Sequence, residues 1–367
     1  MRIRSSLLAV GVVAGLVATG TAVAAPRALV SPLRHHSVVA STVPANGDVN
    51  PYGVAVVPRT TGHLVAGNVL VSNFNNQANL QGTGTTIVQV SPAGRRSVFA
   101  RITPMSLPGR CPGGIGLTTA LGVLRRGWVV VGSLPTTDGS AATARAGCLI
   151  VLNRWGTPVE TFSGGSINGP WDMATVDQGS RATLFVANVL NGTKAAGGMV
   201  VHRGTVLRLR LAVMHRPPQI TSSTVIGRGY GERTDPAALV VGPTGLGIAR
   251  NGTLFVADSV ANRIDAIPDA MTRTSAVRIG RMVSSGGALS TPLGLAIAPN
   301  GDILTVNGGD GRLVETTQPG HQIAIRWLDR SGSPPGSGAL FGLAVRPDQR
   351  AVYYVDDATN TLNLLHH

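Results

Sequence analysis

The stretch 243–264 reads PTGLGIARNGTLFVADSVANRI, and its pattern returns six times along the 367-residue chain. It contains a Pro-x-Gly-apolar run, a turn at Asn251-Gly252, an apolar run that ends at Asp258, and Asn262 four residues later. The other copies begin at NPYGVAVV (50–57), CPGGIGLT (111–118), GPWDMATV (169–176), TPLGLAIAPNG (291–301) and LFGLAVRPD (340–348). A repeat of this kind decides the architecture before any single residue does.

Within each copy, short apolar runs alternate with Gly, Pro, Asn and Asp, which predicts strands joined by tight turns. The copies start about 40 to 60 residues apart, a spacing typical of propeller blades. Five copies contain four candidate strands, whereas the sixth ends after three at His367. We expect the segment 36–43 (HSVVASTV) to supply the missing strand, because closing the ring removes exposed sheet edges. The prediction is an all-β, six-bladed propeller of four-stranded antiparallel blades, closed by the N-terminal strand pairing into the last blade.

The predicted organisation is a signal peptide over 1–25 followed by one domain over 26–367. The signal consists of Arg2 and Arg4, an apolar run and the small residues Ala22-Val23-Ala24. Its apolar run is short for a bilayer, so we expect cleavage, no stable membrane span afterwards, and export to the periplasm or beyond. A retained anchor is the alternative. The predicted blades are 50–102, 111–162, 169–227, 243–283, 291–328, and 340–367 together with 36–43.

The repeat resembles the NHL-repeat family of six-bladed propellers, whose cousins are the gluconolactonase-like propellers. The resemblance covers about residues 36–367 and implies an architecture. NHL propellers include both binding platforms and enzymes, so function has to be argued from a site.

The composition is strongly basic, with 31 Lys and Arg against 17 Asp and Glu and a net charge of +14. Such a charge attracts polyanions such as lipopolysaccharide, acidic glycans or nucleic acid. The arginines are scattered along the sequence, with pairs only at Arg95-Arg96 and Arg125-Arg126. Aromatic residues make up only 4% of the chain, too few for the stacking contacts of nucleic-acid recognition. We therefore expect no sequence-specific nucleic-acid binding.

Cys111 and Cys148 are the only cysteines, and export permits a disulfide between them. Both are expected at the same edge of blade two, about 10 Å apart by strand spacing. That separation exceeds the reach of a disulfide unless the loop that ends in Cys111 folds over. We expect the bridge, with two separate thiols as the alternative.

One face of the predicted ring carries the long connections 73–85, 133–147, 188–204 and 226–242. Long loops on a rigid scaffold are a common place for binding, although neutral loop drift would produce the same lengths. Two sequence columns are expected around the axis on this face. The first is the x of Pro-x-Gly: Tyr52, Gly113, Trp171, Thr244, Leu293 and Phe341. The second ends each second strand: Asn73, Gly132, Asn188, Asp258, Asn307 and Asp356. We expect the Asn and Asp of the second column to cap turns, with contact to a ligand as the alternative.

The gluconolactonase-like resemblance implies a divalent metal held by Glu, Asn and Asp at the top of the channel, where hard oxygen ligands suit such an ion. In this chain the first column is mainly aromatic and apolar, and Asp172 is the nearby carboxylate. That departure disfavours lactonase activity. We expect no cofactor, although Asn-Gly-Gly-Asp-Gly at 307–311 could hold calcium weakly.

The sequence favours an exported, monomeric binding or scaffold protein whose long-loop face receives a glycan or protein. Aromatic contacts would come from Tyr52, Trp171 and Phe341, with hydrogen bonds from the Asn and Asp column. The alternative is a divalent-metal-dependent hydrolase or lactonase using Asp172, Asp258 and Asp356. A quinone-dependent sugar dehydrogenase would need a basic and histidine cluster at the blade starts, which the sequence lacks. No catalytic residue is assigned.

Overall fold

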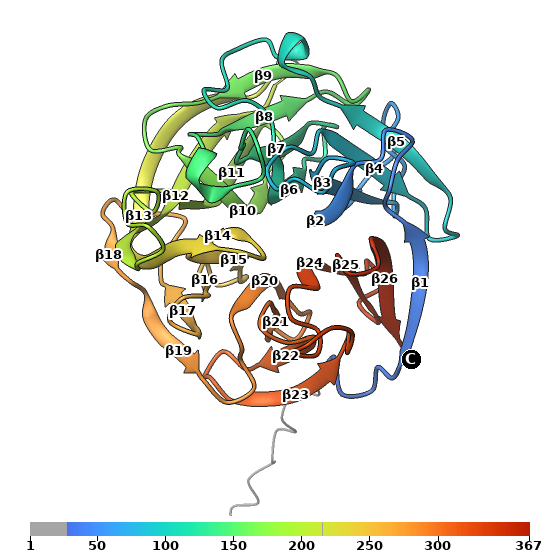
Figure 1. The fold of residues 1–367 in the computed structure, drawn as a ribbon, viewed down its shortest axis with the longest axis vertical. Coiled ribbons are helices and arrows are strands. Elements are labelled where there is room, and N and C mark those ends of the chain that lie inside the picture. Colours follow the sequence, from blue (N-terminus) through green and yellow to red (C-terminus); the bar gives the residue numbers. More distant parts are fainter. Residues whose placement is uncertain (1–27, 215) are drawn as a thin grey trace, which may run out of the picture.

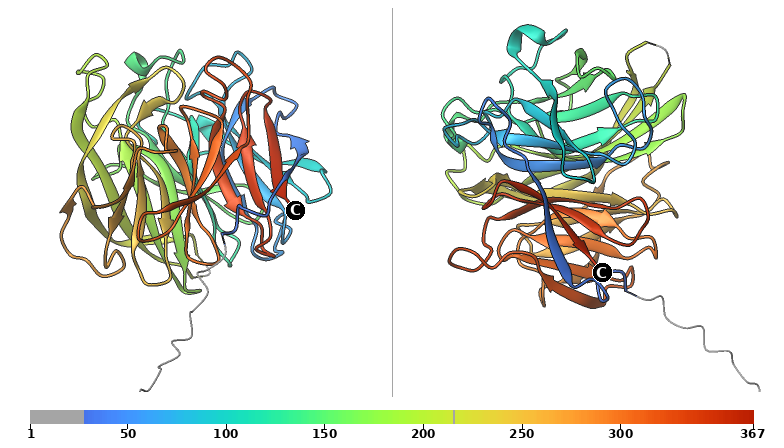
Figure 2. Two further views of the ribbon diagram at one scale, coloured as in Figure 1. Left: turned by 90° about the horizontal axis from the view of Figure 1, so that it is seen from below. Right: turned by 90° about the vertical axis from the view of Figure 1, so that its right-hand side faces the viewer.

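Six antiparallel sheets stand around a central axis in the computed structural model of the chain (Figure 1). The structure describes residues 28–214 and 216–367, so the predicted signal peptide lies outside the described residues. Each blade has four main strands, which confirms the predicted six-bladed propeller. In the side views of Figure 2, the strands run between the two faces of the ring.

The first three blades follow one another along the chain in the order predicted. Blade one contains β2 (Val49–Val56), β3 (Val69–Asn75), β4 (Thr86–Val90) and β5 (Arg96–Arg101). Blade two contains β6 (Leu117–Val123), β7 (Val129–Ser133), β8 (Cys148–Leu152) and β9 (Pro158–Phe162). Blade three contains β10 (Gly169–Asp177), β11 (Arg181–Val189), β12 (Val201–Ala212) and β13 (Gln219–Asp235).

The last three blades complete the ring. Blade four contains β15 (Pro243–Ile248), β16 (Leu254–Asp258), β17 (Arg263–Ile267) and β19 (Arg281–Ser285). Blade five contains β20 (Pro292–Ile297), β21 (Ile303–Asn307), β22 (Arg312–Thr316) and β23 (Gln322–Trp327). Blade six contains β24 (Leu340–Val345), β25 (Val352–Asp356), β26 (Thr361–His366) and, outermost, β1 (His35–Ser41).

Blade six joins the two ends of the chain. β1 pairs antiparallel with β26 in a register that places His35 opposite His366 and Ser41 opposite Thr361. The residues before β1 are also fixed, because the buried Glu315 accepts hydrogen bonds from the backbone N–H of Leu29 (2.8 Å) and of Val30 (2.7 Å). The N-terminal arm therefore packs on blade five before its strand enters blade six.

Blade three differs from the others in its last strand. β13 is 17 residues long, and its final part turns back to pair with β14 (Leu239–Val241). A short outer strand, β18 (Val277–Arg278), pairs with β13 in parallel and ties blade four to blade three. The connection 226–242, which the sequence suggested as a long surface loop, is therefore mostly hairpin.

The glycine of Pro-x-Gly lets neighbouring inner strands approach each other around the axis. A Cβ added to Gly342 of β24 would lie 2.1 Å from the carbonyl oxygen of Tyr52 in blade one. One on Gly294 of β20 would lie 2.0 Å from the carbonyl oxygen of Phe341 in blade six. Such distances are far inside van der Waals contact, so close blade packing requires glycine here.

The register corrects the predicted alignment of blade two. In the other blades the residue before the x position pairs with the end of the second strand, as in Pro243 with Asp258. In blade two this pair is Leu117 with Ser133. The sheet thus begins at Leu117 and not at Cys111, and neither Gly113 nor Gly132 occupies the predicted columns. The motif is hidden because Leu117-Thr118-Thr119 replaces Pro-x-Gly in blade two. β6 also has one extra residue, since Leu117 to Leu121 takes four steps where other blades take three.

Helix is nearly absent from the described residues, where only two short 3-10 turns occur, η1 (Pro104–Ser106) and η2 (Ala141–Thr143). None of the helices in the described part of the chain is long and apolar enough to cross a membrane.

Candidate functional site at the axis and in a basic pocket

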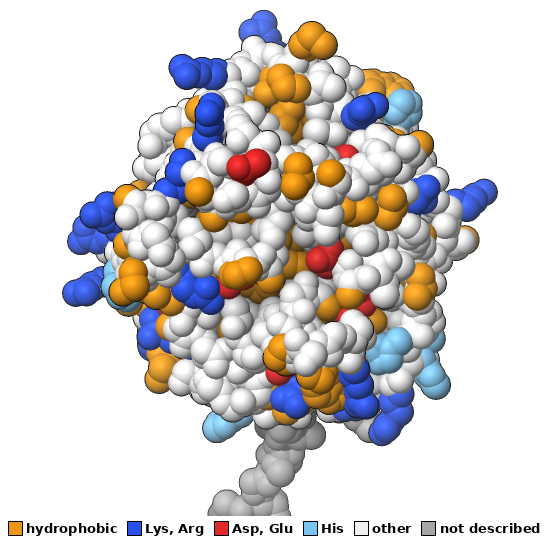
Figure 3. Space-filling view, in the orientation of Figure 1, with side chains coloured by type: hydrophobic (Ala, Val, Ile, Leu, Met, Phe, Trp, Pro, Cys, Tyr) orange, Lys and Arg blue, Asp and Glu red, His pale blue; other side chains and the backbone are white. Residues whose placement is uncertain are grey.

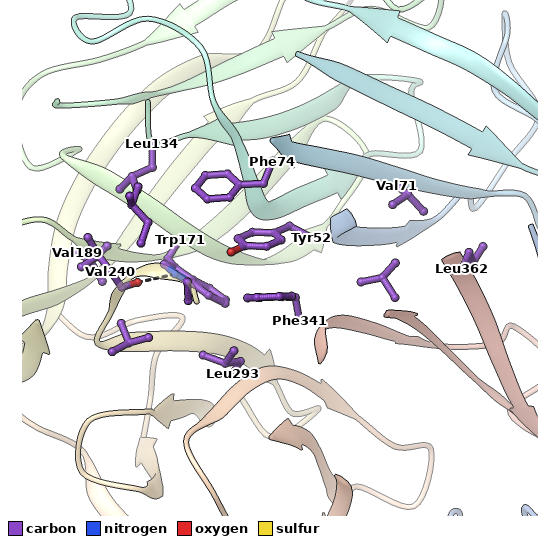
Figure 4. Packing of buried hydrophobic residues seen from close by; sticks show 14 of the residues in the cluster. Tyr52, Val71, Phe74, Leu134, Trp171, Val189, Val240, Leu293, Phe341 and Leu362 are labelled. Atoms are coloured by element: carbon purple, nitrogen blue, oxygen red, sulfur yellow. Dashed lines mark hydrogen bonds between the residues drawn. The ribbon is translucent and has the colours of Figure 1, made fainter. Parts of the chain in front are cut away.

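The predicted aromatic column meets at the axis (Figure 4). The ring of Tyr52 stacks on Phe341 at 3.9 Å and on Phe74 at 4.4 Å between centroids, and Trp171 lies 6.1 Å away. Each of these side chains is at most 2% exposed. They belong to one buried cluster with Leu293, which is also 2% exposed.

The hairpin that ends in β14 covers this cluster. Trp171 donates its indole N–H to the carbonyl oxygen of Val240 at 2.9 Å, and the Tyr52 hydroxyl donates to that of Ala237 at 3.4 Å. Leu239 and Val241 are buried in the same cluster. The aromatic side chains therefore close the channel and are not exposed at its mouth, contrary to the expectation. The sequence alone did not predict this burial, because it suggested a long loop at 226–242 and not a hairpin.

The second predicted column is also buried and is used by the backbone. Its Asn and Asp side chains are at most 6% exposed and bond main-chain groups of nearby connections. Asn188 accepts from the N–H of Asn168 (2.8 Å) and of Gly169 (3.0 Å) through Oδ1. Asn73 donates to the carbonyl oxygen of Thr42, and Asn307 donates to that of Ala288. Asp258 accepts a hydrogen bond from the backbone N–H of Ala261, and Asp356 accepts one from that of Thr359. This geometry fits the turn-capping role.

Thr244 of the first column is likewise fully buried. Its hydroxyl lies 2.6 Å from the Ser259 hydroxyl and donates to the Pro292 carbonyl oxygen at 3.1 Å. It therefore links blade four to blade five and offers no group to a ligand.

Asp172 takes the place of the Pro-x-Gly glycine in blade three. It is 8% exposed, and its Oδ2 accepts the N–H of Leu246 in blade four at 2.9 Å. It lines an axial cavity of about 60 Å³ together with the buried Thr119, whose hydroxyl has no hydrogen-bond partner among the described residues. Burial raises the pKa of Asp172 to about 7, against hydrogen bonds from the N–H of Leu246 and of Met173 that lower it.

The axis does not fit the divalent metal that the gluconolactonase-like resemblance implies. Among the described residues there is no group of three or more His, Cys, Asp or Glu side chains that could hold a metal ion. Asp258 is drawn into an ion pair with Arg263 at 3.1 Å, and Thr119 is the one other polar side chain among the described residues that line the cavity with Asp172. At 307–311, Asp310 accepts hydrogen bonds from Asn307 Nδ2 and Arg312 N, so the loop is closed on itself.

Cys111 and Cys148 form a disulfide, with their Cα atoms 5.3 Å apart. Cys148 starts β8, whereas Cys111 lies in the connection before β6. That connection folds over, with the N–H of Gly113 donating to the carbonyl oxygen of Ala146 at 2.8 Å. The wider spacing expected from strand positions does not arise, because Cys111 is not at the start of a strand.

A larger cavity lies on the opposite face, where first strands turn into second strands and third strands into fourth. It has a volume of about 820 Å³ and is formed by turns of blades one, two and three. Among the described residues, the charged side chains that line it are all arginines: Arg59, Arg125, Arg126 and Arg154. We call this cavity the basic pocket.

Glycines bring the turns of the basic pocket together. A Cβ on Gly127 would lie 2.6 Å from Thr61 Cγ2 and 2.9 Å from Arg154 Cβ. The N–H of His63 donates to the carbonyl oxygen of Arg154 at 2.9 Å, which fixes the turn of blade one on that of blade two. Arg126 donates through Nε to the Gly179 carbonyl oxygen at 2.9 Å and reaches blade three.

The four guanidinium groups lack carboxylate partners. None of the ion pairs between described residues involves an arginine of the basic pocket. Asp177 is close, but it accepts the backbone N–H of Arg125 at 2.5 Å and that of Gly179 at 2.7 Å. The pocket thus presents positive charge that no carboxylate neutralises.

Sequence reasoning missed this site because its arginines come from separate turns. Only the pair Arg125-Arg126 is adjacent, and Arg59 and Arg154 are brought in by the ring. The available signal was positional: both arginine-bearing connections of blade two lie on one face of an antiparallel sheet.

No protein-family model matches the chain, and no curated protein matches it in sequence. Solved structures resemble it in fold. A candidate gluconolactonase is 15% identical with a TM-score of 0.56, covering 90% of this chain and 91% of its own. A gluconolactonase from Xanthomonas campestris is 12% identical with a TM-score of 0.54, covering 92% and 90%. The calcium-binding protein regucalcin from Agrobacterium tumefaciens is 12% identical with a TM-score of 0.51, covering 89% and 92%.

Identities of this size establish shared fold and nothing finer. The likeness spans nearly the whole length of both partners, so it describes the complete ring and not a single blade. The chain is a six-bladed β-propeller of the same architecture as the gluconolactonase-like proteins.

Proposed function

We propose that this protein is a binding protein that takes an anionic ligand in the basic pocket. The observation that carries the proposal is the convergence of four arginines without carboxylate partners on one cavity of about 820 Å³. Guanidinium groups pair with carboxylate, sulfate and phosphate through two parallel hydrogen bonds, and pairing in a pocket is stronger than on an open surface.

The wider charge distribution supports the same face. Connections between first and second strands carry further arginines in blades four and six, at Arg250 and Arg350, whereas Arg346 is paired with Asp348. The long-loop face, seen in Figure 3, has acidic side chains around its centre and most of its Lys and Arg toward the margin. An anion is thus attracted to the face of the basic pocket and less to the face that the sequence favoured.

The test is calorimetric titration with sucrose octasulfate, with uncharged sucrose as its control. We expect binding of the sulfated sugar only, weakened by added salt. The double variant Arg125→Ser/Arg126→Ser should bind at least tenfold more weakly, because each charged hydrogen bond contributes about 1.5 to 3 kcal/mol. The matched control is Arg110→Ser/Arg145→Ser, which removes two exposed arginines from the long-loop face. If both double variants lost the same amount of affinity for sucrose octasulfate, binding would come from the overall charge and not from the pocket, and the proposal would be wrong.

A second candidate is a divalent-metal-dependent hydrolase or lactonase, supported by the fold shared with gluconolactonases and by the axial carboxylate of Asp172. The described residues do not fit a metal, so we derive no reaction from this candidate. A rise in melting temperature with micromolar calcium or zinc that disappears in Asp172→Ala, together with hydrolysis of gluconolactone, would favour it over binding alone.

A further inference from the structure

We infer that the ligand of the basic pocket is the headgroup of an anionic lipid, and that the protein docks on a membrane surface with this face. The inference rests on the proposed function, because the same arginines would hold the headgroup. It adds a source for the anion and assigns a role to apolar side chains that an anion alone does not explain.

Exposed apolar side chains stand at the rim of the basic pocket. Trp155 is 51% exposed and Met214 is 59% exposed, and both line the cavity that the arginines line. Val65, in the blade-one turn that contacts Arg154, is 45% exposed. Large apolar side chains at turn tips beside arginines are typical of surfaces that enter the interfacial layer of a bilayer, where Trp is enriched.

Trp155 is placed for insertion better than for holding a sugar. The guanidinium carbon of Arg154 lies 5.6 Å from its ring centroid and covers ring surface that a stacked pyranose would need. The ring of His63 stands against it at 5.0 Å and 85°. Half of the indole still reaches solvent. A ring supported in this way keeps its exposed part directed away from the protein.

Arginines at the turn tips extend the docking surface beyond the pocket. In blades one to four the connections between third and fourth strands carry Arg95, Arg154, Arg216 and Arg273. All belong to the same face, because neighbouring strands are antiparallel. Each basic residue near an anionic membrane surface adds about 1 kcal/mol, so a face of several arginines binds without deep insertion. A groove that grips one glycan chain would not require arginines spread over four blades.

The experiment measures co-sedimentation with vesicles of phosphatidylcholine alone or mixed with phosphatidylglycerol. We expect the protein to bind the mixed vesicles only. Arg125→Ser/Arg126→Ser should weaken this binding about fivefold for each arginine removed. Arg110→Ser/Arg145→Ser, on the other face, should leave it unchanged.

A variant that spares the arginines separates lipid from other anions. Trp155→Ser/Met214→Ser should weaken vesicle binding about tenfold through lost apolar burial. Val65→Ser, whose side chain is exposed beside the pocket but does not line it, should also weaken vesicle binding, while its affinity for sucrose octasulfate stays within twofold of wild type. Brominated lipid should quench tryptophan fluorescence in the wild type, and the quenching should disappear in Trp155→Phe.

Each result has one meaning. Binding of sucrose octasulfate without binding of mixed vesicles overturns the membrane inference and leaves the proposed function standing. Vesicle binding that does not respond to Trp155→Ser/Met214→Ser also overturns it. If the protein binds neither sucrose octasulfate nor the mixed vesicles, both the inference and the proposed function are overturned.

Discussion

Asp172 is the residue that most sets blade three apart from the other blades, because an acid replaces the glycine at the axis. Burial raises its pKa to about 7 in the folded protein, against about 3.9 in an unfolded chain. As pH rises from about 4 to 7, the unfolded chain releases this proton while the folded protein keeps it. The folded state therefore loses stability across that window, by about 4 kcal/mol at most, since one pKa unit corresponds to about 1.4 kcal/mol.

Asp172→Asn should remove this pH dependence while retaining an acceptor for the Leu246 N–H. Urea unfolding at about pH 5 and pH 8 should show the variant gaining stability relative to wild type at the higher pH. The exposed carboxylate of Asp269 provides the control, because Asp269→Asn should follow the wild-type profile. A constant difference between Asp172→Asn and wild type at all pH values would contradict the prediction.

At the scale of single elements, the inner strands of four blades carry a glycine where they approach a neighbouring blade. Gly342→Ala places a methyl group 2.1 Å from the Tyr52 carbonyl oxygen, so β24 must move away from β2. We expect a loss of about 1 to 3 kcal/mol in the free energy of unfolding, as for other overpacked sites. Gly109→Ala is the control, because its added Cβ meets nothing closer than 3.3 Å at an exposed position. Chemical denaturation that finds the two variants equally stable would show that the ring accommodates the methyl group.

The disulfide of blade two is the other element-scale test. It closes a loop with a sequence separation of 37 residues. Restricting an unfolded chain by a loop of that length stabilises the folded protein by about 4 kcal/mol in the chain-entropy model. The double variant Cys111→Ala/Cys148→Ala should lose a comparable amount and should no longer respond to reductant. Unchanged wild-type stability after reduction would contradict this prediction.

For the whole molecule, the ring depends on β1 in blade six. A chain that starts at residue 43 lacks β1 and the arm held by Glu315, and leaves β26 as an exposed edge. We expect a lower melting temperature and concentration-dependent aggregation, because unpaired edges recruit other chains. A chain that starts at residue 28 keeps both features and should behave as the full chain does. Size-exclusion chromatography and thermal melts of the two truncations make the comparison.

The fold was predictable from the sequence because the blade motif is repeated along the chain. Alternation of apolar residues and turn residues recurs in each copy, so an error in one copy does not alter the architecture. Blade two shows the limit: Leu117-Thr118-Thr119, where the sheet begins, contains neither Pro nor Gly, whereas Cys111-Pro112-Gly113-Gly114 upstream imitates the motif. Burial of Trp171 was not predictable, because it depends on a distant hairpin that folds back over the axis. The basic pocket was not predictable either, because its arginines lie in turns of separate blades that come together only in the folded ring.

The pairing of β1 with β26 in blade six also affects the order in which the protein folds. Among the described residues, β1 is the first strand to be synthesised, yet the strand that it pairs with is β26, the last of them. Blades one to five can each form from neighbouring strands as soon as these are made. The pairing of β1 with β26, which places His35 opposite His366, can form only after β26 has been made. A pairing between the two ends of a long chain forms slowly, because a large loop must close before any contact rewards it. Closure of the ring therefore requires β26 to have been made, and β1 has no sheet partner in a nascent chain until then.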